Sequence, residues 1–117
     1  MKLSEIKDIL KARVLTRGDD LGRNIVAGGA ADIMEAFLSA VAKDGLILTG
    51  LMSEEVVRTA TISQVGGVVF VRGQEPTARI IGQAESFNLP LLVTEYSMFV
   101  SIGKLYMNGL RGLDGSW

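Results

Sequence analysis

Three short apolar runs constrain the fold of this 117-residue chain more than any other feature of its sequence. They occupy residues 46–48, 68–71 and 91–93, and each is followed by small or polar residues and then by a helical pattern. Continuous runs of branched apolar residues, separated by helix-length segments, are typical of strands that are buried on both faces. The sequence therefore predicts a parallel sheet with right-handed crossover helices.

Apolar periodicity and capping signals predict helices around these strands. The expected helical segments are residues 3–10, 32–43, 53–64, 76–88 and 97–108. The second of them has the widest apolar stripe, formed by Ile33, Met34, Phe37, Leu38 and Val41.

The N-terminal part predicts two further short strands, at residues 13–16 and 24–27, which we expect to pair with each other in an antiparallel manner. The expected fold class is thus α/β, with a central, mostly parallel sheet of βα units and a short antiparallel or mixed N-terminal part. The length of the chain predicts that residues 1–117 form one domain, and we expect a frayed tail at residues 111–117.

Gly28 and Gly29 stand between a predicted strand and a predicted helix. Small residues at such a place form a tight turn, or they let backbone N–H groups approach a phosphate at the helix N-terminus. The longer fingerprints of dinucleotide-binding and P-loop proteins are both absent, so the tight turn is favoured and the phosphate cradle is the alternative.

Composition excludes several classes of function. Lys and Arg number 12 against 13 Asp and Glu, and the basic residues are scattered, so neither nucleic acid nor a membrane is expected as a partner. No apolar run approaches the ~20 residues of a membrane span. The N-terminal residues 1–5 turn polar before a signal-peptide core forms, which predicts a cytoplasmic location.

The chain contains no Cys and no His. This absence excludes disulfides, nucleophilic catalysis by Ser–His or Cys–His pairs, and most transition-metal sites. We therefore expect no enzyme activity, no cofactor and no metal. A small hydrolase or transferase working through Asp, Glu, Lys or Tyr is the remaining enzymatic alternative.

The hydrophobic fraction of 48% is high for a small domain, and an oligomer interface would cover the surplus apolar surface. We expect a homodimer. The predicted contact is the last helix, with Met98, Ile102, Leu105 and Tyr106, and the helix with Met34 and Phe37 is a second candidate.

The residues that follow the three central strands should gather at one edge of the sheet, where ligands of such sheets usually bind. They supply hydroxyls, backbone N–H groups and one guanidinium, which suit a nucleotide or another phosphate-bearing small molecule. Alternatively, the threonines are turn or cap residues, and the arginine pairs with Glu75 or Glu95. The predicted ligand-binding residues are Thr49, Gly50, Arg72, Gly73, Thr94 and Ser97.

The segments 46–51, 68–73 and 90–99 together resemble a stand-alone DRTGG domain, and residues 1–6 and 29–34 fit the same family. Thr49 and Gly50 match the middle of the family name. The Asp-Arg pair of the name is absent ahead of Asp32, and its final glycine is replaced by Leu51.

The resemblance implies a small α/β regulatory or ligand-sensing module. Such modules are accessory parts beside CBS domains in inorganic pyrophosphatases and within some phosphotransacetylases. The implied fold is similar to the N-terminal domain of the kinase that phosphorylates the phosphocarrier protein of sugar uptake. The expected function is therefore a non-catalytic regulatory module, and the alternative is a structural adaptor that binds a partner enzyme and no small molecule.

Overall fold

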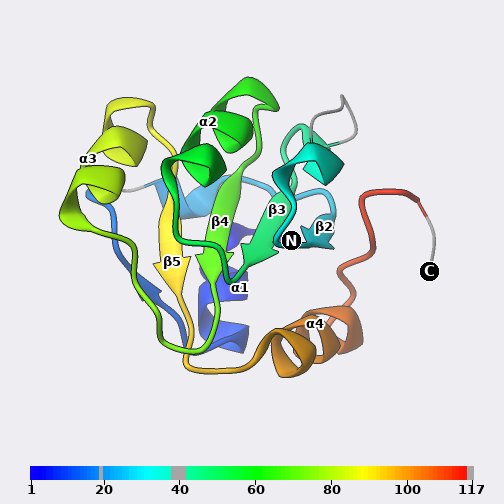
Figure 1. Cartoon of the computed structure of the whole chain (residues 1–117). Helices are drawn as coiled ribbons and strands as arrows, with labels where there is room; N and C mark the ends of the chain where they lie inside the picture. The colour runs from blue at the N-terminus through cyan, green and yellow to red at the C-terminus, as the bar shows by residue number, and fades with distance from the viewer. Residues whose placement is uncertain (19, 38–41, 116–117) are drawn as a thin grey trace.

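A computed structural model of the chain describes residues 1–18, 20–37 and 42–115. Its core is a five-stranded sheet in the order β1-β5-β4-β3-β2 (Figure 1). The predicted parallel centre is confirmed, because adjacent strands from β2 to β5 all pair in parallel, whereas β1 joins the edge of β5 antiparallel. The strand bounds are β1 Arg13–Val14, β2 Gly28–Ala30, β3 Leu46–Thr49, β4 Gly67–Phe70 and β5 Leu91–Val93.

Helices lie on both faces of the sheet. The first face carries α2 and α3, and the second carries α1 and α4. The α-helices are α1 Leu3–Ile9, α2 Glu54–Ile62, α3 Ala78–Ser86 and α4 Met98–Met107, and the short 3-10 helices are η1 Asp20–Gly22 and η2 Met34–Phe37.

Local capping explains where the last two helices begin. The Thr77 hydroxyl accepts a hydrogen bond from the N–H of Ile80 at the start of α3, and the Ser97 hydroxyl accepts one from the N–H of Val100 at the start of α4. Both groups satisfy backbone donors that the first helical turn leaves free. The helices predicted over residues 3–10, 53–64, 76–88 and 97–108 are confirmed, with bounds one to two residues shorter at most ends.

The predicted antiparallel pairing of the two N-terminal strands is wrong. β1 lies on one edge of the sheet against β5, whereas β2 lies on the other edge against β3. The second strand also comes later than predicted, at residues 28–30 rather than 24–27. Residues 15–27 separate the two strands in the chain, and the strands lie at opposite edges of the sheet, so their partners are set by tertiary packing rather than by a local turn.

Gly28 and Gly29 therefore form part of a strand, which corrects both the tight-turn and the phosphate-cradle expectations. Their small size serves close packing. A Cβ on Gly29 would lie 2.8 Å from Phe37 Cε1 and 2.8 Å from Leu113 Cδ1, and one on Gly28 would lie 3.0 Å from Leu110 Cδ2. Larger residues here would push the covering segments off the edge strand.

The predicted helix over residues 32–43 is only partly present. Residues 34–37 form the 3-10 helix η2, and residues 38–41, with Leu38 and Val41, lie outside the described residues. In a 3-10 helix, residues three apart share a side. Met34 and Phe37 accordingly both enter the core, while Ile33 stays 70% exposed.

The predicted fraying of the tail is wrong for residues 111–113. Gly112 forms a parallel bridge with Gly28, in which the N–H of Gly28 donates to Arg111 O at 2.8 Å and the N–H of Leu113 donates to Gly28 O at 3.0 Å. Leu113 also packs against the first-face core. Trp117 lies outside the described residues.

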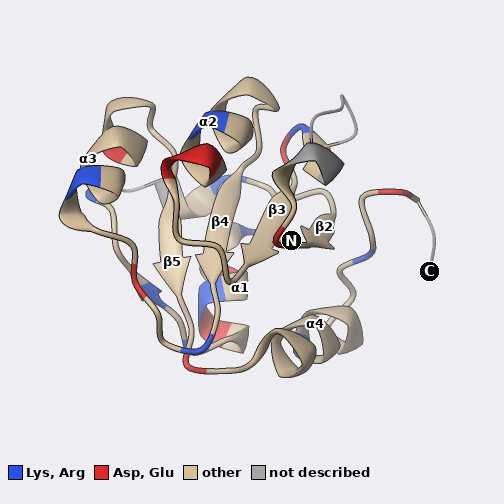
Figure 2. Cartoon of the chain, viewed as in Figure 1, with Lys and Arg blue, Asp and Glu red and all other residues tan. Residues whose placement is uncertain are grey.

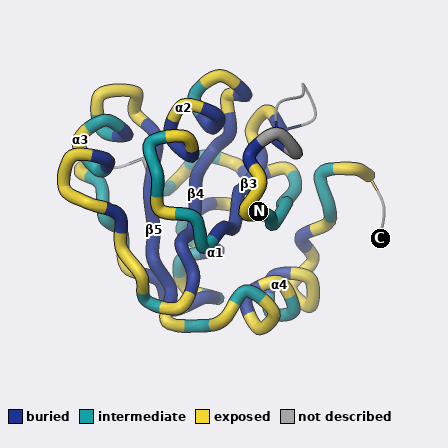
Figure 3. The backbone as a smooth tube through the Cα atoms, in the orientation of Figure 1, coloured by how far each residue is buried: buried dark blue, intermediate teal, exposed yellow. Residues whose placement is uncertain are grey.

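Burial is unequal along the helices (Figure 3). The central strands are buried along their whole length, but α4 buries only Ser101 and Leu105 among its ten residues. Phe99 and Met107 on the same helix are 87% and 86% exposed. Within the described ranges, no helix combines the length and the apolar character that crossing a membrane requires.

Candidate functional site

The carboxyl ends of β3, β4 and β5 meet at one edge of the sheet, as the parallel register dictates. The loops that follow β4 and β5 are joined there by backbone hydrogen bonds. The N–H of Arg72 donates to Tyr96 O at 2.9 Å, and the N–H of Gly73 donates to Thr94 O at 2.8 Å. Gly73 and Arg72 both have positive φ, which turns the chain back at this corner.

Thr49 and Thr94 play the same structural part in successive units. Each hydroxyl accepts the N–H two residues on, from Leu51 at 3.1 Å and from Tyr96 at 3.3 Å. Each also donates, Thr49 to Asp32 Oδ1 at 3.0 Å and Thr94 to Leu10 O at 2.7 Å. Both side chains are buried, so the alternative of turn residues describes them, and neither hydroxyl faces solvent.

The position of Asp32 at this edge was not predicted from the sequence. It was expected at a helix start, but its carboxylate accepts the Thr49 hydroxyl and also the N–H of Gly50, at 2.8 Å. The pairing of Ala30 with Leu48 sets this contact, because it brings the residues after β2 beside the end of β3. The chain's own carboxylate thus occupies donors that would suit a bound anion.

Arg72 is exposed and lies over Gly50. A Cβ on Gly50 would be 3.4 Å from Arg72 Nη2 and 3.6 Å from Asp32 Oδ1, so cation and carboxylate approach the same point. No residue in the described ranges forms an ion pair with Arg72. The expected pairings with Glu75 and Glu95 are therefore not formed.

The two glutamates have other positions. Glu75 Oε2 lies 2.6 Å from Arg13 Nη2, and this hydrogen bond lowers the pKa of Glu75 and raises that of Arg13. The Glu95 carboxylate lies against Gly73, where a Cβ would collide with it. Figure 2 shows these charges along the loops at the carboxyl edge, next to an α4 surface that carries few charges.

The remaining predicted ligand residue, Ser97, is exposed at the start of α4, where its hydroxyl is engaged as a cap. Ser53 precedes α2 a few residues beyond Gly50, and its buried hydroxyl has no hydrogen-bond partner among the described residues. The structure thus gathers Thr49, Gly50, Arg72, Gly73 and Thr94 at one edge. Of these, Arg72 offers a free polar side chain.

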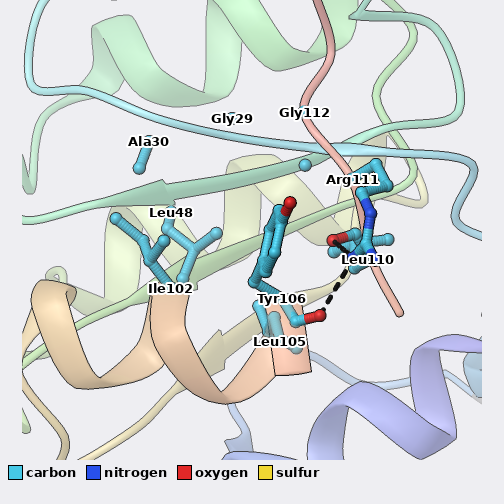
Figure 4. Close-up of a pocket in the computed structure, with 10 residues that line it drawn as sticks. Gly29, Ala30, Leu48, Ile102, Leu105, Tyr106, Leu110, Arg111 and Gly112 are labelled. Carbon is cyan, nitrogen blue, oxygen red and sulfur yellow. Dashed lines mark hydrogen bonds between the residues drawn. The ribbon is translucent and has the colours of Figure 1, made fainter. Parts of the chain in front are cut away.

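A cleft of about 310 Å³ opens between α4, the edge of the sheet and the tail. Figure 4 shows the Tyr106 ring standing between Arg111 on one side and Leu48 and Ile102 on the other. The Arg111 guanidinium lies 4.1 Å from the ring centroid, and its Nη1 donates to Tyr106 O at 2.9 Å. Ile102 and Tyr106 were predicted from the sequence as dimer contacts, but no sequence pattern indicated the cleft. The cleft is lined by Gly28, Gly29, Ala30, Leu48, Ile102, Leu105, Tyr106, Leu110, Arg111 and Gly112.

The described residues include no cluster of three or more acidic side chains that could hold a metal ion. A general acid or base must lie within reach of the substrate. The Thr49 hydroxyl has the Asp32 carboxylate beside it, but Thr49 is fully buried, so a substrate cannot reach that hydroxyl.

Comparisons with known proteins give a consistent result. The model of the DRTGG domain family matches residues 5–106. The crystal structure of the CBS and DRTGG domains of the regulatory region of Clostridium perfringens pyrophosphatase, complexed with its activator diadenosine tetraphosphate, is similar with a TM-score of 0.67 and 18% sequence identity. The match covers 89% of this chain and 45% of that chain, so this chain spans less than half of the similar structure. No curated protein matches the sequence. At this identity the structural likeness establishes the fold.

Proposed function

The chain belongs to the DRTGG domain family, and we propose that it is a non-catalytic regulatory module that senses a small anionic ligand at the carboxyl edge of its sheet. The observation that carries this proposal is the Arg72 guanidinium above Gly50, which forms no ion pair with any described residue. A guanidinium offers a planar fork of donors that matches phosphate and carboxylate groups.

The Asp32 carboxylate gives this site a means of response. It accepts the Gly50 N–H and thereby acts as an internal anion. A phosphate bound by Arg72 would compete with Asp32 for that N–H, because two anions repel each other at one donor. Binding would then free the segment between β2 and η2, which is how the edge would signal to the rest of the domain.

Two features support regulation rather than catalysis. The sequence lacks His and Cys, and the threonine hydroxyls of the edge are buried and hydrogen-bonded within the chain. The similar structure belongs to the regulatory region of a pyrophosphatase and contains a nucleotide activator, which makes a nucleotide ligand and a partner enzyme natural candidates here. The cytoplasmic location expected from the sequence is part of the same proposal.

The exposed side of α4 supports the homodimer that the sequence led us to expect. The contact surface needs a correction, because Leu105, Met34 and Phe37 are buried in the core and cannot reach a partner. We place the contact instead on the outer face of α4, defined by Phe99 and Met107. The same face favours the second candidate function, an adaptor that binds a partner enzyme and no small molecule.

Thermal melting with added nucleotides and inorganic phosphate tests the proposed function. A ligand at a hundred times its Kd should add about 2.7 kcal/mol of stability. Arg72→Ala should weaken anion binding by about 1.5–3 kcal/mol, the range for a hydrogen bond to a charged group. Asp32→Asn should act in the opposite direction and strengthen binding, because it removes the competing charge.

The matched control is Arg58→Ala, which removes an exposed arginine from α2 and should leave binding unchanged. Binding that Arg72→Ala leaves intact would place the anion elsewhere. The absence of a shift with every anion would favour the adaptor.

A further inference from the structure

We propose that the cleft beside α4 is the second half of the anion site and takes the base of a nucleoside phosphate whose phosphate contacts Arg72. The inference rests on the proposed function for the phosphate half, but the cleft itself is a separate observation. The ligand it assigns is a nucleoside phosphate rather than a bare anion.

The cleft has the size and the walls of a small-molecule site. Its volume of about 310 Å³ falls within the range of ligand pockets, which is about 300–1,000 Å³. Its floor is formed by Gly28, Gly29 and Ala30 of β2, and the largest side chain of that floor is the methyl group of Ala30. Leu48 and Ile102 supply aliphatic walls, so the site favours an apolar planar body over a hydrated one.

Tyr106 adds an aromatic wall that is held in place before a ligand arrives. Arg111 packs on the ring and hydrogen-bonds to the backbone of Tyr106, which limits the freedom of the side chain. Stacking on an aromatic side chain is tolerant of base identity, since every base has a π-face. The wall therefore predicts recognition of a nucleobase with little selectivity among bases.

The cleft and the cationic edge adjoin at the end of β3. Leu48 lines the cleft and packs with the second-face core, and Gly50, directly after the strand, faces Arg72. Two residues of extended chain span at most about 7 Å, so Leu48 and Gly50 are close to each other. A ligand that spans both halves needs a spacer between ring and anion, as the sugar of a nucleoside phosphate provides, and an aromatic carboxylate would be too short.

A second copy of the chain is the competing occupant, since α4 also carries the proposed dimer contact. The two surfaces adjoin but have different members. Phe99 and Met107 are 87% and 86% exposed and lie outside the cleft, whereas Ile102 and Tyr106 line it. At 100° per residue, Tyr106 lies only about 20° around the helix from Phe99, so the oligomeric state of the cleft variants must be measured beside their nucleotide binding.

Calorimetric titration of the full chain with adenosine monophosphate, adenosine and inorganic phosphate tests the inference, and the other three ribonucleoside monophosphates complete the panel. We expect the monophosphates to bind at least about tenfold more tightly than inorganic phosphate, within the range for stacking of one base. Ala30→Phe fills the cleft from its floor and should remove that advantage, while binding of inorganic phosphate stays unchanged.

Tyr106→Ala provides a second variant with a lower risk of misfolding, because Tyr106 is 40% exposed. It should lower nucleotide affinity toward that of phosphate, and Tyr106→Phe should restore it, since the ring and not the hydroxyl makes the wall. Phe99→Ala is the matched control, because it removes an aromatic ring from the same helix outside the cleft.

Three results separate the two proposals. If phosphate binds through Arg72 but no monophosphate binds more tightly, the cleft assignment is overturned and the anion site stands. If adenosine binds and Ala30→Phe abolishes this binding while phosphate alone never binds, the cleft stands and the anion site fails. If Ala30→Phe changes the oligomeric state and no nucleotide binding, the cleft is a subunit contact and the inference is wrong.

Discussion

Helices α2 and α4 have nearly the same length, but they relate to the sheet in opposite ways. α2 buries Val56, Val57, Thr59 and Ala60, although its sequence is rich in polar residues. α4 is far more apolar in sequence, yet it buries only Ser101 and Leu105. Apolar content measures what a helix could bury, whereas the fold decides how much of it the chain itself covers.

The two helices therefore have different tasks. The α2 side belongs to a closed core that includes Phe70, the last residue of the middle strand β4. The α4 side leaves apolar surface and an open cleft at the molecular surface. Stability should reside mainly in the first region and binding in the second.

The largest expected effect is the loss of folding stability when a buried side chain is replaced by alanine, which should differ between the two regions. Phe70→Ala should destabilise the protein by about 3–5 kcal/mol, because it leaves a closed cavity beneath α2 and α3. Leu105→Ala should cost about 2 kcal/mol, the low end for a buried leucine, because Leu105 lines a cleft that is already open. Urea denaturation measures both values, and equal costs would contradict the comparison.

The next effect concerns association. Phe99→Asp should weaken self-association at least about tenfold, since it places a charge at the centre of the proposed contact face. Analytical ultracentrifugation over a dilution series measures this change, and circular dichroism checks that the fold is retained. Phe87→Asp is the control, because Phe87 is also exposed but follows α3 on the other face. A wild-type chain that remains monomeric at tens of micromolar would remove the dimer from the proposal.

A smaller effect of opposite sign is expected within α4. The Ser101 hydroxyl is fully buried and has no hydrogen-bond partner among the described residues. Ser101→Ala should therefore stabilise the protein by up to about 1 kcal/mol. Ser97→Ala, four residues earlier, removes the helix cap and should destabilise by about 1 kcal/mol. Thermal melting of the two variants should move the midpoint in opposite directions, and a loss of stability in both would show that the hydroxyl of Ser101 is satisfied.

The smallest effect tests the ion pair between β1 and the loop before α3. The hydrogen bond from Arg13 lowers the pKa of Glu75 below its ordinary value of 4.5 in the folded state. A lowered folded pKa gives stability above the unfolded pKa, and this stability is lost as the pH falls through the folded pKa. Glu75→Gln removes this titration, so the free energy of unfolding of the variant should depend less on pH below about pH 4.5 than that of the wild type. The difference should be small, because both side chains are exposed. Acid titration at two salt concentrations measures it, and a wild-type profile in the variant would show that the pair contributes nothing.

Local signals explain which parts of the fold could be predicted. The central strands are almost entirely apolar, and Pro76 and Asn88 mark the two ends of one helix, so each pattern is complete within a few residues of sequence. The edge strands are two and three residues long and contain no usable periodicity. Their partners depend on segments far away in the chain, and the prediction that they pair with each other failed for that reason.

The candidate site divides in the same manner. The parallel order of the strands was enough to bring Thr49, Arg72 and Thr94 to one edge. The contact of Asp32 with Gly50 required the pairing of β2 with β3, which the sequence did not indicate. The cleft required both the position of α4 and the return of the tail to β2, and neither has a local signal.

The return of the tail also bears on how the sheet could meet other chains. β2 is an outer strand, and a strand at the border of a sheet exposes backbone groups that can recruit another chain and start a growing ribbon. The segment around Gly112 occupies that border by pairing with Gly28. A glycine-rich stretch that looks dispensable in sequence thus covers backbone groups of β2 that would otherwise be open to a neighbouring molecule.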